Sequence, residues 1–482
     1  MAGSDETPEY DPEPFARRKT FYIKAECELA GTSNPLHGKM FVESLVPLMK
    51  QQQYPIVLIH GDYHTGQIWL TKPDGKPGWA AAFLHAGYQV YVIDLPPIGR
   101  SNIMTDQKFA DKREKLNFMP PALAEKQLTA PQKTDVENEL ENLGWPTAIF
   151  HDKWPGTGKR GDTTFENYHM STSVLSLQKE ERQLLAQTAL RNLLKESGKA
   201  ILLGQGSGTT MAWLAADAEP DLVAGVIAVE PAGPPFGLAH TMVDKRRQYT
   251  ESVKLDLTNR LYGLADIPLT YEPPTRPVKM EDNRLKVVPF DLDLYKEPIT
   301  GGTCILQRDA NKTRETQPLT NLGKSSSPCR PRQLIHLKKM PHVVVTAQAG
   351  SHSMFDWATV MFMLQAGLSL EWMRLEQHSI FGNGHLMFLE TNSNEIAALL
   401  FDWINRAVKE CQSPTSTFTL TDEELHFDGS SFQPIDLTVE TDPHMTHGGV
   451  TGRDFVDIFR TSIVADLQMT KNVPMFSLPR YP

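Results

Sequence analysis

One stretch, Lys199 to Gly233, constrains the fold more than any other part of the chain. It begins with a short apolar run, Ile201 to Leu203, breaks at five residues rich in glycine, GQGSG, and continues as a helix rich in Ala, Trp and Leu. A second apolar run follows and ends in Glu230. This order of strand, tight turn and helix is typical of a nucleophile elbow, which holds one side chain above a sheet at a helix N-terminus.

The register of this turn leaves the reactive residue open. The residues two before and two after a nucleophile are small because the turn is tight, so Gly204 and Gly208 flank Gly206, which has no side chain to react. Ser207 lies one residue later, but Gln205 would then be a bulky residue on the tight side of the turn. The alternatives are an elbow shifted locally to Ser207, an elbow with glycine at its centre, and a glycine-rich loop without chemistry.

Length and composition set wider limits. The 482 residues exceed the usual size of one core, so we expect two domains or one core with long insertions. The net charge of -10 argues against a nucleic-acid partner. Four dispersed cysteines, an acidic N-terminus and the absence of a membrane-length apolar run indicate a cytoplasmic protein with no membrane partner.

The pattern along the chain predicts the α/β class. Lys19 to Glu28 and Lys39 to Leu45 alternate as in an antiparallel hairpin. Continuous apolar runs then alternate with helical segments, which predicts a mostly parallel sheet buried on both faces. The apolar runs surround Ile56, Val90, Ile201, Val226 and Val343, and the helices are expected at 79–86, 178–197, 355–366 and 394–408.

Two long segments interrupt this alternation and read as insertions over one core. The first covers 101–175, and the second, 236–340, is interpreted as a cap or lid with a mobile portion. The expected division is a disordered leader 1–18, core segments 19–100, 176–235 and 341–410, and a C-terminal extension 411–482. The C-terminal extension is expected to pack either over the core or over a partner subunit. The second alternative would make the protein a homodimer.

The best candidate for a catalytic histidine is His385, at the end of the segment FGNGH. It lies after the last core strand and before the last core helix, where this arrangement presents such a histidine on a loop. His60 and His64 flank a turn glycine, and we expect structural roles for both. No HExxH motif or paired His/Asp cluster appears, so we expect no metal and no cofactor.

The orienting acid has two candidates. The segment VVVTAQAGSHSM after the seventh expected strand holds no carboxylate, and Asp356 is the first one beyond it. Glu230 ends the strand that follows the elbow helix, and a buried strand-end glutamate needs a partner such as an imidazole N–H. We therefore predict that a Glu230 oxygen lies within hydrogen-bond reach of His385. A structural pairing of Glu230 with a basic residue is the alternative.

Five segments resemble an unusual bacterial esterase family of the α/β-hydrolase superfamily and its longer fungal relatives, several of them tied to secondary-metabolite pathways: IHGDYHTGQIW, TKPDGKPGWAAAFLHAGY, YVIDLPPIGRS, AVEPAG and FGNGHLMFLETNSNEIAALLFDWI. The resemblance covers about 21–99, 199–235 and 341–408. It implies an α/β-hydrolase fold and a Ser-His-Glu triad whose acid follows the sixth strand, which assigns Glu230 and His385. Gly206 stands where the family has its serine, and Asp62 and Tyr63 replace the family's vicinal cysteines in the oxyanion loop.

Three functional hypotheses follow. In the first, Ser207 is the nucleophile, His385 takes its proton, and Glu230 orients the imidazole. Backbone N–H groups of Gly208 and of the loop at Gly61 and Asp62 then hold the oxyanion. This hypothesis gives an ester or lactone hydrolase acting on a mid-sized apolar carbonyl compound, in fungal secondary metabolism by the resemblance.

In the second hypothesis Gly206 holds the nucleophile position, so no acyl-enzyme forms. His385 and Glu230 then act as a base opposite the oxyanion hole, as in a lyase or cyclase that removes a proton next to a carbonyl. In the third, the protein is an inactive binding member of the superfamily, although intact His385 and Glu230 argue against it. Hydrolysis is the preferred hypothesis because it is the default of the superfamily.

Overall fold

The computed structural model describes most of the chain between residues 14 and 408, namely 14–28, 35–101, 116–132, 145–243, 249–281, 284–296, 302–309, 316–319 and 330–408. Most of the expected leader and the C-terminal extension lie outside the described residues. The expected leader ended at residue 18, but the first strand already begins at Ala16. Across the described part, no helix is both long and apolar enough to span a membrane.

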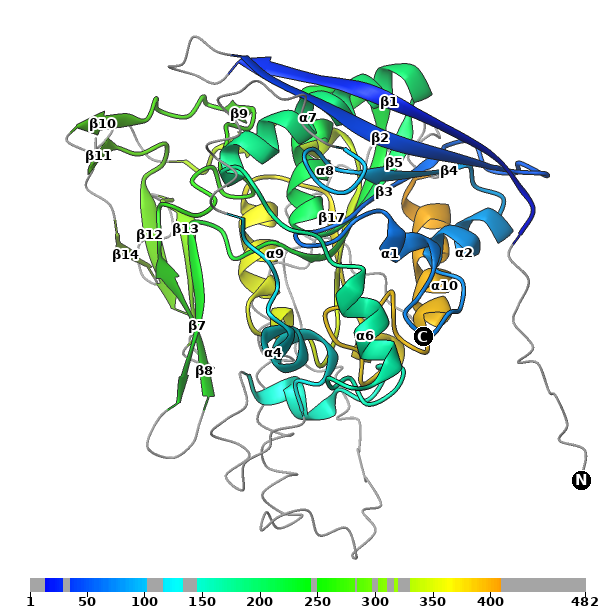
Figure 1. Cartoon of the computed structure of the whole chain (residues 1–482). Coiled ribbons are helices and arrows are strands. Elements are labelled where there is room, and N and C mark those ends of the chain that lie inside the picture. Colours follow the sequence, from blue (N-terminus) through cyan, green and yellow to red (C-terminus); the bar gives the residue numbers. More distant parts are fainter. Residues whose placement is uncertain are drawn as a thin grey trace, which may run out of the picture.

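A sheet of eight strands forms the centre of the molecule (Figure 1). Its order is β1-β2-β4-β3-β5-β6-β16-β17, with β1 and β2 antiparallel to their neighbours and the other neighbours parallel. The strands are β1 (Ala16–Glu28), β2 (Pro35–Pro47), β3 (Ile56–Ile59), β4 (Val90–Asp94), β5 (Ala200–Gly206), β6 (Val223–Pro231), β16 (His342–Thr346) and β17 (Leu370–Arg374). This strand order is that of the α/β-hydrolase fold, so the predicted fold class is confirmed.

The five apolar runs named from the sequence all lie in this one sheet, as predicted. Every residue of β3, β4, β5, β6 and β16 is buried. Alternate side chains enter different apolar clusters: Leu202 belongs to one cluster and Leu203 to the other. Helices cover both faces of the sheet, which is why these strands read as continuous apolar runs.

The helices of the core match their expected positions to within a few residues. Helix α7 begins after a capping box in which Gln178 and Glu181 each bond the other's backbone, which explains its sharp start. The core helices are α1 (Gln67–Leu70), α2 (Trp79–His85), α7 (Lys179–Ser197), α8 (Ser207–Ala218), α9 (Asp356–Gln365) and α10 (Ser393–Trp403). The shorter helical turns are η4 (Pro220–Leu222), η5 (Leu337–Lys339), η6 (Ser351–Met354), η7 (Leu375–His378) and η8 (Ile404–Val408).

The first insertion forms short helices that lie together at one end of the molecule, around α4 and α6 in Figure 1. They are α4 (Pro121–Ala124), η2 (Glu125–Thr129), η3 (Pro146–Phe150) and α6 (Thr163–Met170). The Trp145 indole N–H donates to the carbonyl oxygen of Ala349 at 3.0 Å. This insertion is therefore attached to the loop that follows β16.

The second insertion contains a sheet of its own, which the sequence analysis did not predict. Its five strands run in the order β14-β12-β13-β8-β7, beside the core in Figure 1. They are β7 (Gly237–Val243), β8 (Tyr249–Leu255), β12 (Leu292–Lys296), β13 (Thr303–Gln307) and β14 (Thr316–Pro318). Two small pairs of strands lie outside this sheet: β9 (Tyr271–Glu272) with β15 (Gln333–Leu334), and β10 (Lys279–Glu281) with β11 (Arg284–Val287). The expected mobile portion of this insertion was given no bounds, and residues 310–315 and 320–329 lie outside the described residues.

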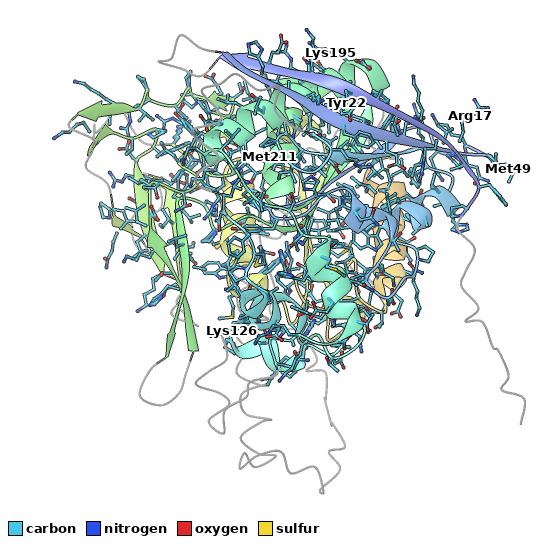
Figure 2. The ribbon with its side chains drawn as sticks, in the orientation of Figure 1. Arg17, Tyr22, Met49, Lys126, Lys195 and Met211 are labelled. Atoms are coloured by element: carbon cyan, nitrogen blue, oxygen red, sulfur yellow. The ribbon has the colours of Figure 1, made fainter. Side chains whose placement is uncertain are left out.

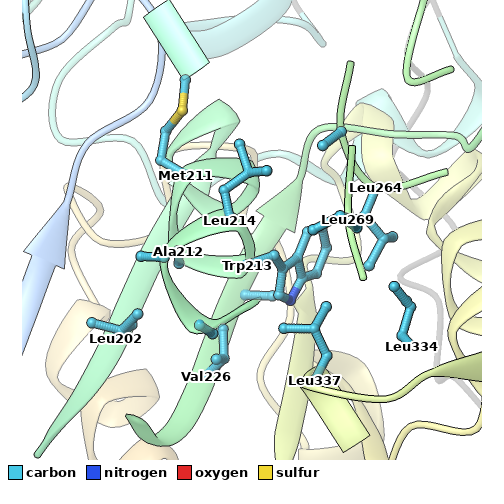
Figure 3. Close-up of a cluster of buried hydrophobic side chains, with 14 of the residues drawn as sticks. Leu202, Met211, Ala212, Trp213, Leu214, Val226, Leu264, Leu269, Leu334 and Leu337 are labelled. Carbon is cyan, nitrogen blue, oxygen red and sulfur yellow. The ribbon is translucent and has the colours of Figure 1, made fainter. Parts of the chain in front are cut away.

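The second insertion shares its apolar core with the central sheet. Figure 3 shows side chains of α8 packed with Leu264, Leu269, Leu334 and Leu337 of the insertion, around the fully buried Trp213. By contrast, Arg17 and Tyr22 of β1, labelled in Figure 2, are exposed. The insertion therefore packs into the hydrophobic core through buried, large apolar side chains.

Candidate active site

The elbow between β5 and α8 is centred on residue 206. Gly206 has φ 55° and ψ -124°, a conformation that strongly favours glycine. A Cβ on Gly204 would lie 2.6 Å from the backbone of Thr209, and one on Gly208 would lie 2.5 Å from the carbonyl oxygen of His60. Gly204 and Gly208 therefore leave no room for side chains, as required of the two residues that flank the centre of the turn.

His385 faces this centre. A Cβ built on Gly206 would lie 3.8 Å from His385 Nε2, and apart from the chain neighbours Gln205 and Ser207, only His385 atoms of the described residues come within 4 Å of it. Ser207 points elsewhere: its hydroxyl donates to Asp62 Oδ1 at 2.8 Å, and Arg182 pairs with the same oxygen at 2.5 Å. The local shift that would bring Ser207 opposite His385 is absent, because position 206 already occupies the apex.

Glu230 holds the other side of the imidazole. His385 Nδ1 donates to Glu230 Oε2 at 2.7 Å, so the predicted hydrogen bond is present. The second oxygen of Glu230 accepts from the Ala347 backbone N–H at 2.9 Å, and the carboxylate is fully buried. A side chain at residue 350 would collide with this carboxylate, so Gly350 makes room for it. These contacts fix the carboxylate and thereby the orientation of the imidazole.

Asp356, the rival acid, does not contact His385 in a hydrogen bond. It accepts from Thr346 Oγ1 at 2.7 Å and from His352 Nδ1 at 3.1 Å. Burial raises the pKa of Asp356 well above its usual value, and burial lowers the pKa of His352 to about 3. The His352 ring stacks on the His385 ring with centroids 4.8 Å apart and planes 15° apart. This stacking restricts the tilt of the His385 ring.

Glu230, His352 and His385 are the one group of potential metal ligands in the described residues, with ligand atoms within 4.8 Å of one another. A ring nitrogen binds a metal through a lone pair in the plane of its ring. The two rings are stacked nearly parallel, so their lone pairs do not converge on one point. Glu230 is also engaged by His385 and Ala347. The arrangement fits a base and its supporting groups better than a metal site.

The loop that carries His385 is held by contacts that the sequence analysis missed. Buried Glu390 accepts from His151 Nε2 at 2.8 Å, from the Gly384 backbone N–H at 2.9 Å and from Asn383 Nδ2 at 2.6 Å. His151 belongs to the first insertion, so this insertion helps to fix the position of His385. Only the dense Gly-Asn-Gly pattern before His385 indicated that the loop was special.

The loop after β3 lies beside the elbow. Tyr63 has φ 65°, and buried His60 and His64 support the loop as expected: His60 Nε2 accepts from the Leu95 backbone N–H at 2.9 Å, and His64 Nε2 lies 3.0 Å from the Tyr168 hydroxyl. Burial lowers the pKa of His64 to about 3, so its ring is neutral. The first backbone N–H groups of α8 have no partner within the helix, and they lie at the elbow. The geometry thus offers N–H donors for an oxyanion.

Gln205 is a second residue whose role the sequence analysis missed. It is 1% exposed, and its Nε2 lies 2.7 Å from His385 Nε2. A Cβ on Gly61 would lie 2.5 Å from Gln205 Oε1, so the glycine of the oxyanion loop makes room for this amide. Gln205 therefore occupies the side of the imidazole that faces the elbow.

The chain is similar to several known proteins. No protein-family model matches the chain. The chain is 32% identical over 373 residues, 76% of its length and 86% of the relative's, to a fungal protein described as probable secreted lipase phiG, from Fungal sp. (strain ATCC 74256). Among solved structures, a novel bacterial esterase matches 83% of this chain and 100% of its own at 17% identity, with a TM-score of 0.46. The carboxylesterase CesB of Bacillus subtilis matches 80% of this chain and 92% of its own at 13% identity, with a TM-score of 0.32.

Proposed function

The chain belongs to the family of esterase- and lipase-like α/β-hydrolase-fold enzymes that includes the fungal relative, and from this premise we propose that it hydrolyses esters or lactones without a serine nucleophile. In this proposal His385, oriented by Glu230, acts as a general base on a water molecule. The observation that carries the proposal is Gly206 at the apex of the elbow, facing His385 Nε2. The chain keeps the base of a hydrolase and lacks the side chain that would be acylated.

The chemical step conserves atoms and charge. His385 Nε2 takes a proton from the water while the water oxygen adds to the carbonyl carbon, and the carbonyl electrons move to the oxygen. The tetrahedral intermediate then collapses, the bond to the leaving oxygen breaks, and that oxygen takes the proton back from Nε2. Glu230, which accepts from Nδ1 at 2.7 Å, stabilises the imidazolium between the two transfers.

The proposed oxyanion site uses backbone N–H groups at the start of α8 together with the loop at Gly61 and Asp62. The Asp62 carboxylate would repel an oxyanion, but it is bound by Arg182 and by the Ser207 hydroxyl. We therefore assign Ser207 and Arg182 the role of holding Asp62 away from the oxyanion position. Gly208 keeps α8 close to the end of β3, because a larger residue would collide with the carbonyl oxygens of Ile59 and His60.

The proposed substrate is a mid-sized apolar carbonyl compound, an ester or lactone of secondary metabolism. Support comes from Trp145 of the first insertion, which packs with Met354 and Phe355 of the core, and Phe355 in turn contacts His352 beside His385. A cytoplasmic location and a homodimer remain predictions, and the fungal relative is itself described as secreted. Fractionation of the native cells and light scattering of the purified protein test these two points.

A second candidate function is a lyase or cyclase that uses the same base. It is favoured by the position above Gly206, where, apart from the chain neighbours Gln205 and Ser207, only His385 atoms of the described residues lie within 4 Å of a built Cβ. A substrate carbon could approach Nε2 there and lose a proton next to its carbonyl group. An inactive binding protein would show neither reaction.

The test is product analysis in isotopically labelled water. A panel of aryl esters and lactones is incubated with the enzyme in H₂¹⁸O and, separately, in D₂O, with His385→Ala as the control. The proposal expects ¹⁸O in the carboxylic acid product and no reaction with the control. Deuterium on carbon without ¹⁸O would instead support the lyase or cyclase, and binding without turnover would contradict both enzymatic functions.

A further inference from the structure

The carboxamide of Gln205 lies where a triad serine would contact the imidazole. Its Nε2 is 2.7 Å from His385 Nε2, and the side chain is 1% exposed at the end of β5. Gly61 is the residue that makes this placement possible, because a Cβ there would lie 2.5 Å from Gln205 Oε1. The contact thus depends on Gln205 at the end of β5 and on Gly61 in the loop after β3.

The direction of this hydrogen bond follows from Glu230. Because Nδ1–H of His385 donates to Glu230, the Nε2 atom of the neutral ring carries a lone pair and accepts. The Gln205 amide must therefore present its NH₂ group to Nε2. Its other atom, Oε1, is buried and has no hydrogen-bond partner among the described residues. An unsatisfied buried carbonyl is unfavourable, so this orientation leaves the amide with an unmet acceptor.

Proton uptake reverses the requirement at Nε2. Once His385 carries a proton there, Nε2 becomes a donor, and two N–H groups would face each other. A half-turn of the carboxamide would place Oε1 against Nε2–H and would satisfy the acceptor that is unmet in the neutral state. A carboxamide is an uncharged group that carries both a donor and an acceptor on one rotatable end.

We propose that Gln205 is a positioning residue whose amide follows the protonation state of His385, donating to the neutral base and accepting from the imidazolium during turnover. The proposal rests on the proposed role of His385 as the base. The attacking water binds the Nε2 lone pair after the amide NH₂ has withdrawn, and the amide oxygen then accepts from Nε2–H once the proton of the water has been transferred. Gln205 thereby replaces one function of the missing hydroxyl, which is to keep the imidazole aimed at the elbow.

The groups that surround His385 make this amide effective. The titratable neighbours are Glu230 on β6, His352 on η6, Asp356 at the start of α9 and His64 after β3. Burial lowers the pKa of both His64 and His352 to about 3, so those rings are neutral, and it raises the pKa of Asp356. None of these neighbours offers His385 Nε2 a charged hydrogen-bond acceptor. The amide oxygen of Gln205 is therefore the nearest group that can accept a hydrogen bond from Nε2–H.

The test compares Gln205→Met, which keeps the volume and removes the hydrogen bond, with Gln205→Glu, which can only accept when ionised. Gln187→Met, a half-buried glutamine whose amide donates to the Leu214 carbonyl, is the matched control. Titration of His385 by NMR of histidine-labelled protein is the first readout. Gln205→Glu is expected to raise the His385 pKa by about one unit or more, because an acceptor carboxylate stabilises the imidazolium.

Kinetics give the second readout. Gln205→Met is expected to lower kcat about tenfold or more with little change in KM, since a contact made to the imidazolium is lost. Gln205→Glu should move the acidic limb of kcat/KM to higher pH by the same amount as the NMR shift. Wild-type kcat in Gln205→Met, or an unchanged His385 titration in Gln205→Glu, would overturn the proposal. Full activity in His385→Ala would refute the proposed function alone, because the NMR titration still tests the contact with Gln205.

Discussion

Installing a hydroxyl at the apex should convert this site into one that forms an acyl-enzyme. In Gly206→Ser the Cβ would lie 3.8 Å from His385 Nε2, and the hydroxyl one bond further can come within the roughly 2.6–3.2 Å reach of a general base. The new hydroxyl would compete with Gln205, whose amide now occupies Nε2. We expect a burst of alcohol or phenol equal to one equivalent of enzyme, followed by slower turnover.

The substitution has a cost that the backbone sets. A non-glycine residue at φ 55° and ψ -124° is strained, and such strain is worth on the order of 1–3 kcal/mol. Gly206→Ala carries the same strain without the hydroxyl and is the matched control, so urea denaturation should show similar losses of stability for both variants. Any difference in reactivity between them then belongs to the oxygen.

The assay is intact-protein mass spectrometry after treatment with an aryl organophosphonate, together with stopped-flow kinetics on an aryl ester. Folded Gly206→Ser should gain one phosphonyl group on Ser at position 206, and wild-type and Gly206→Ala should gain none at the elbow. Labelling of wild-type protein on Ser207 would refute the reasoning. Folded Gly206→Ser without label would show that His385 does not reach the apex.

Three further predictions follow from the site. Glu230→Gln should lower kcat by about 10²–10⁴-fold, because the amide disturbs the tautomer and orientation of His385; steady-state kinetics with a circular dichroism control test this. Glu390→Gln should lower kcat and also the urea unfolding midpoint, because the buried carboxylate accepts from three donors that place the His385 loop; steady-state kinetics and urea denaturation measure the two effects. Burial lowers the pKa of His64 to about 3 and of His342 to about 4, so the unfolded chain binds more protons below pH 6.5. The contribution of each histidine to the free energy of unfolding should then be fully present above about pH 6.5. It should decrease by about 1.4 kcal/mol per pH unit as the pH falls below this value, as measured by urea titration at several pH values.

The parts of the site that were predictable depend on short-range rules. The tight turn requires small residues two positions on either side of its centre, and Gly204 and Gly208 pointed to Gly206, but the sequence alone left this register open and the preferred hypothesis used Ser207; the structure has Gly206 at the centre. Likewise, the lack of a carboxylate after β16 left Glu230 as the acid, and the hydrogen bond to His385 is present. The buried strands were predictable because parallel strands covered on both faces are apolar throughout.

The parts that were missed depend on contacts between distant segments. Gln205 and His385 are 180 residues apart, and His151 and Glu390 are 239 apart, so no local pattern links either pair. The five-stranded sheet of the second insertion was missed for a related reason. Its strands lie among polar segments, and β13 pairs with β8 as well as with β12, its neighbour in sequence. Tertiary packing decides such pairings.

The central claim is that His385, and not a serine, supplies the chemistry of this site. The most direct measurement compares kcat/KM of Ser207→Ala with kcat/KM of His385→Ala on one substrate that the wild-type enzyme turns over. We predict that Ser207→Ala keeps most of the wild-type activity, because its hydroxyl is bonded to Asp62 and not to the imidazole and Arg182 still holds Asp62, and that His385→Ala loses about 10²–10⁴-fold. A loss of several orders of magnitude in Ser207→Ala, or full activity in His385→Ala, would contradict it.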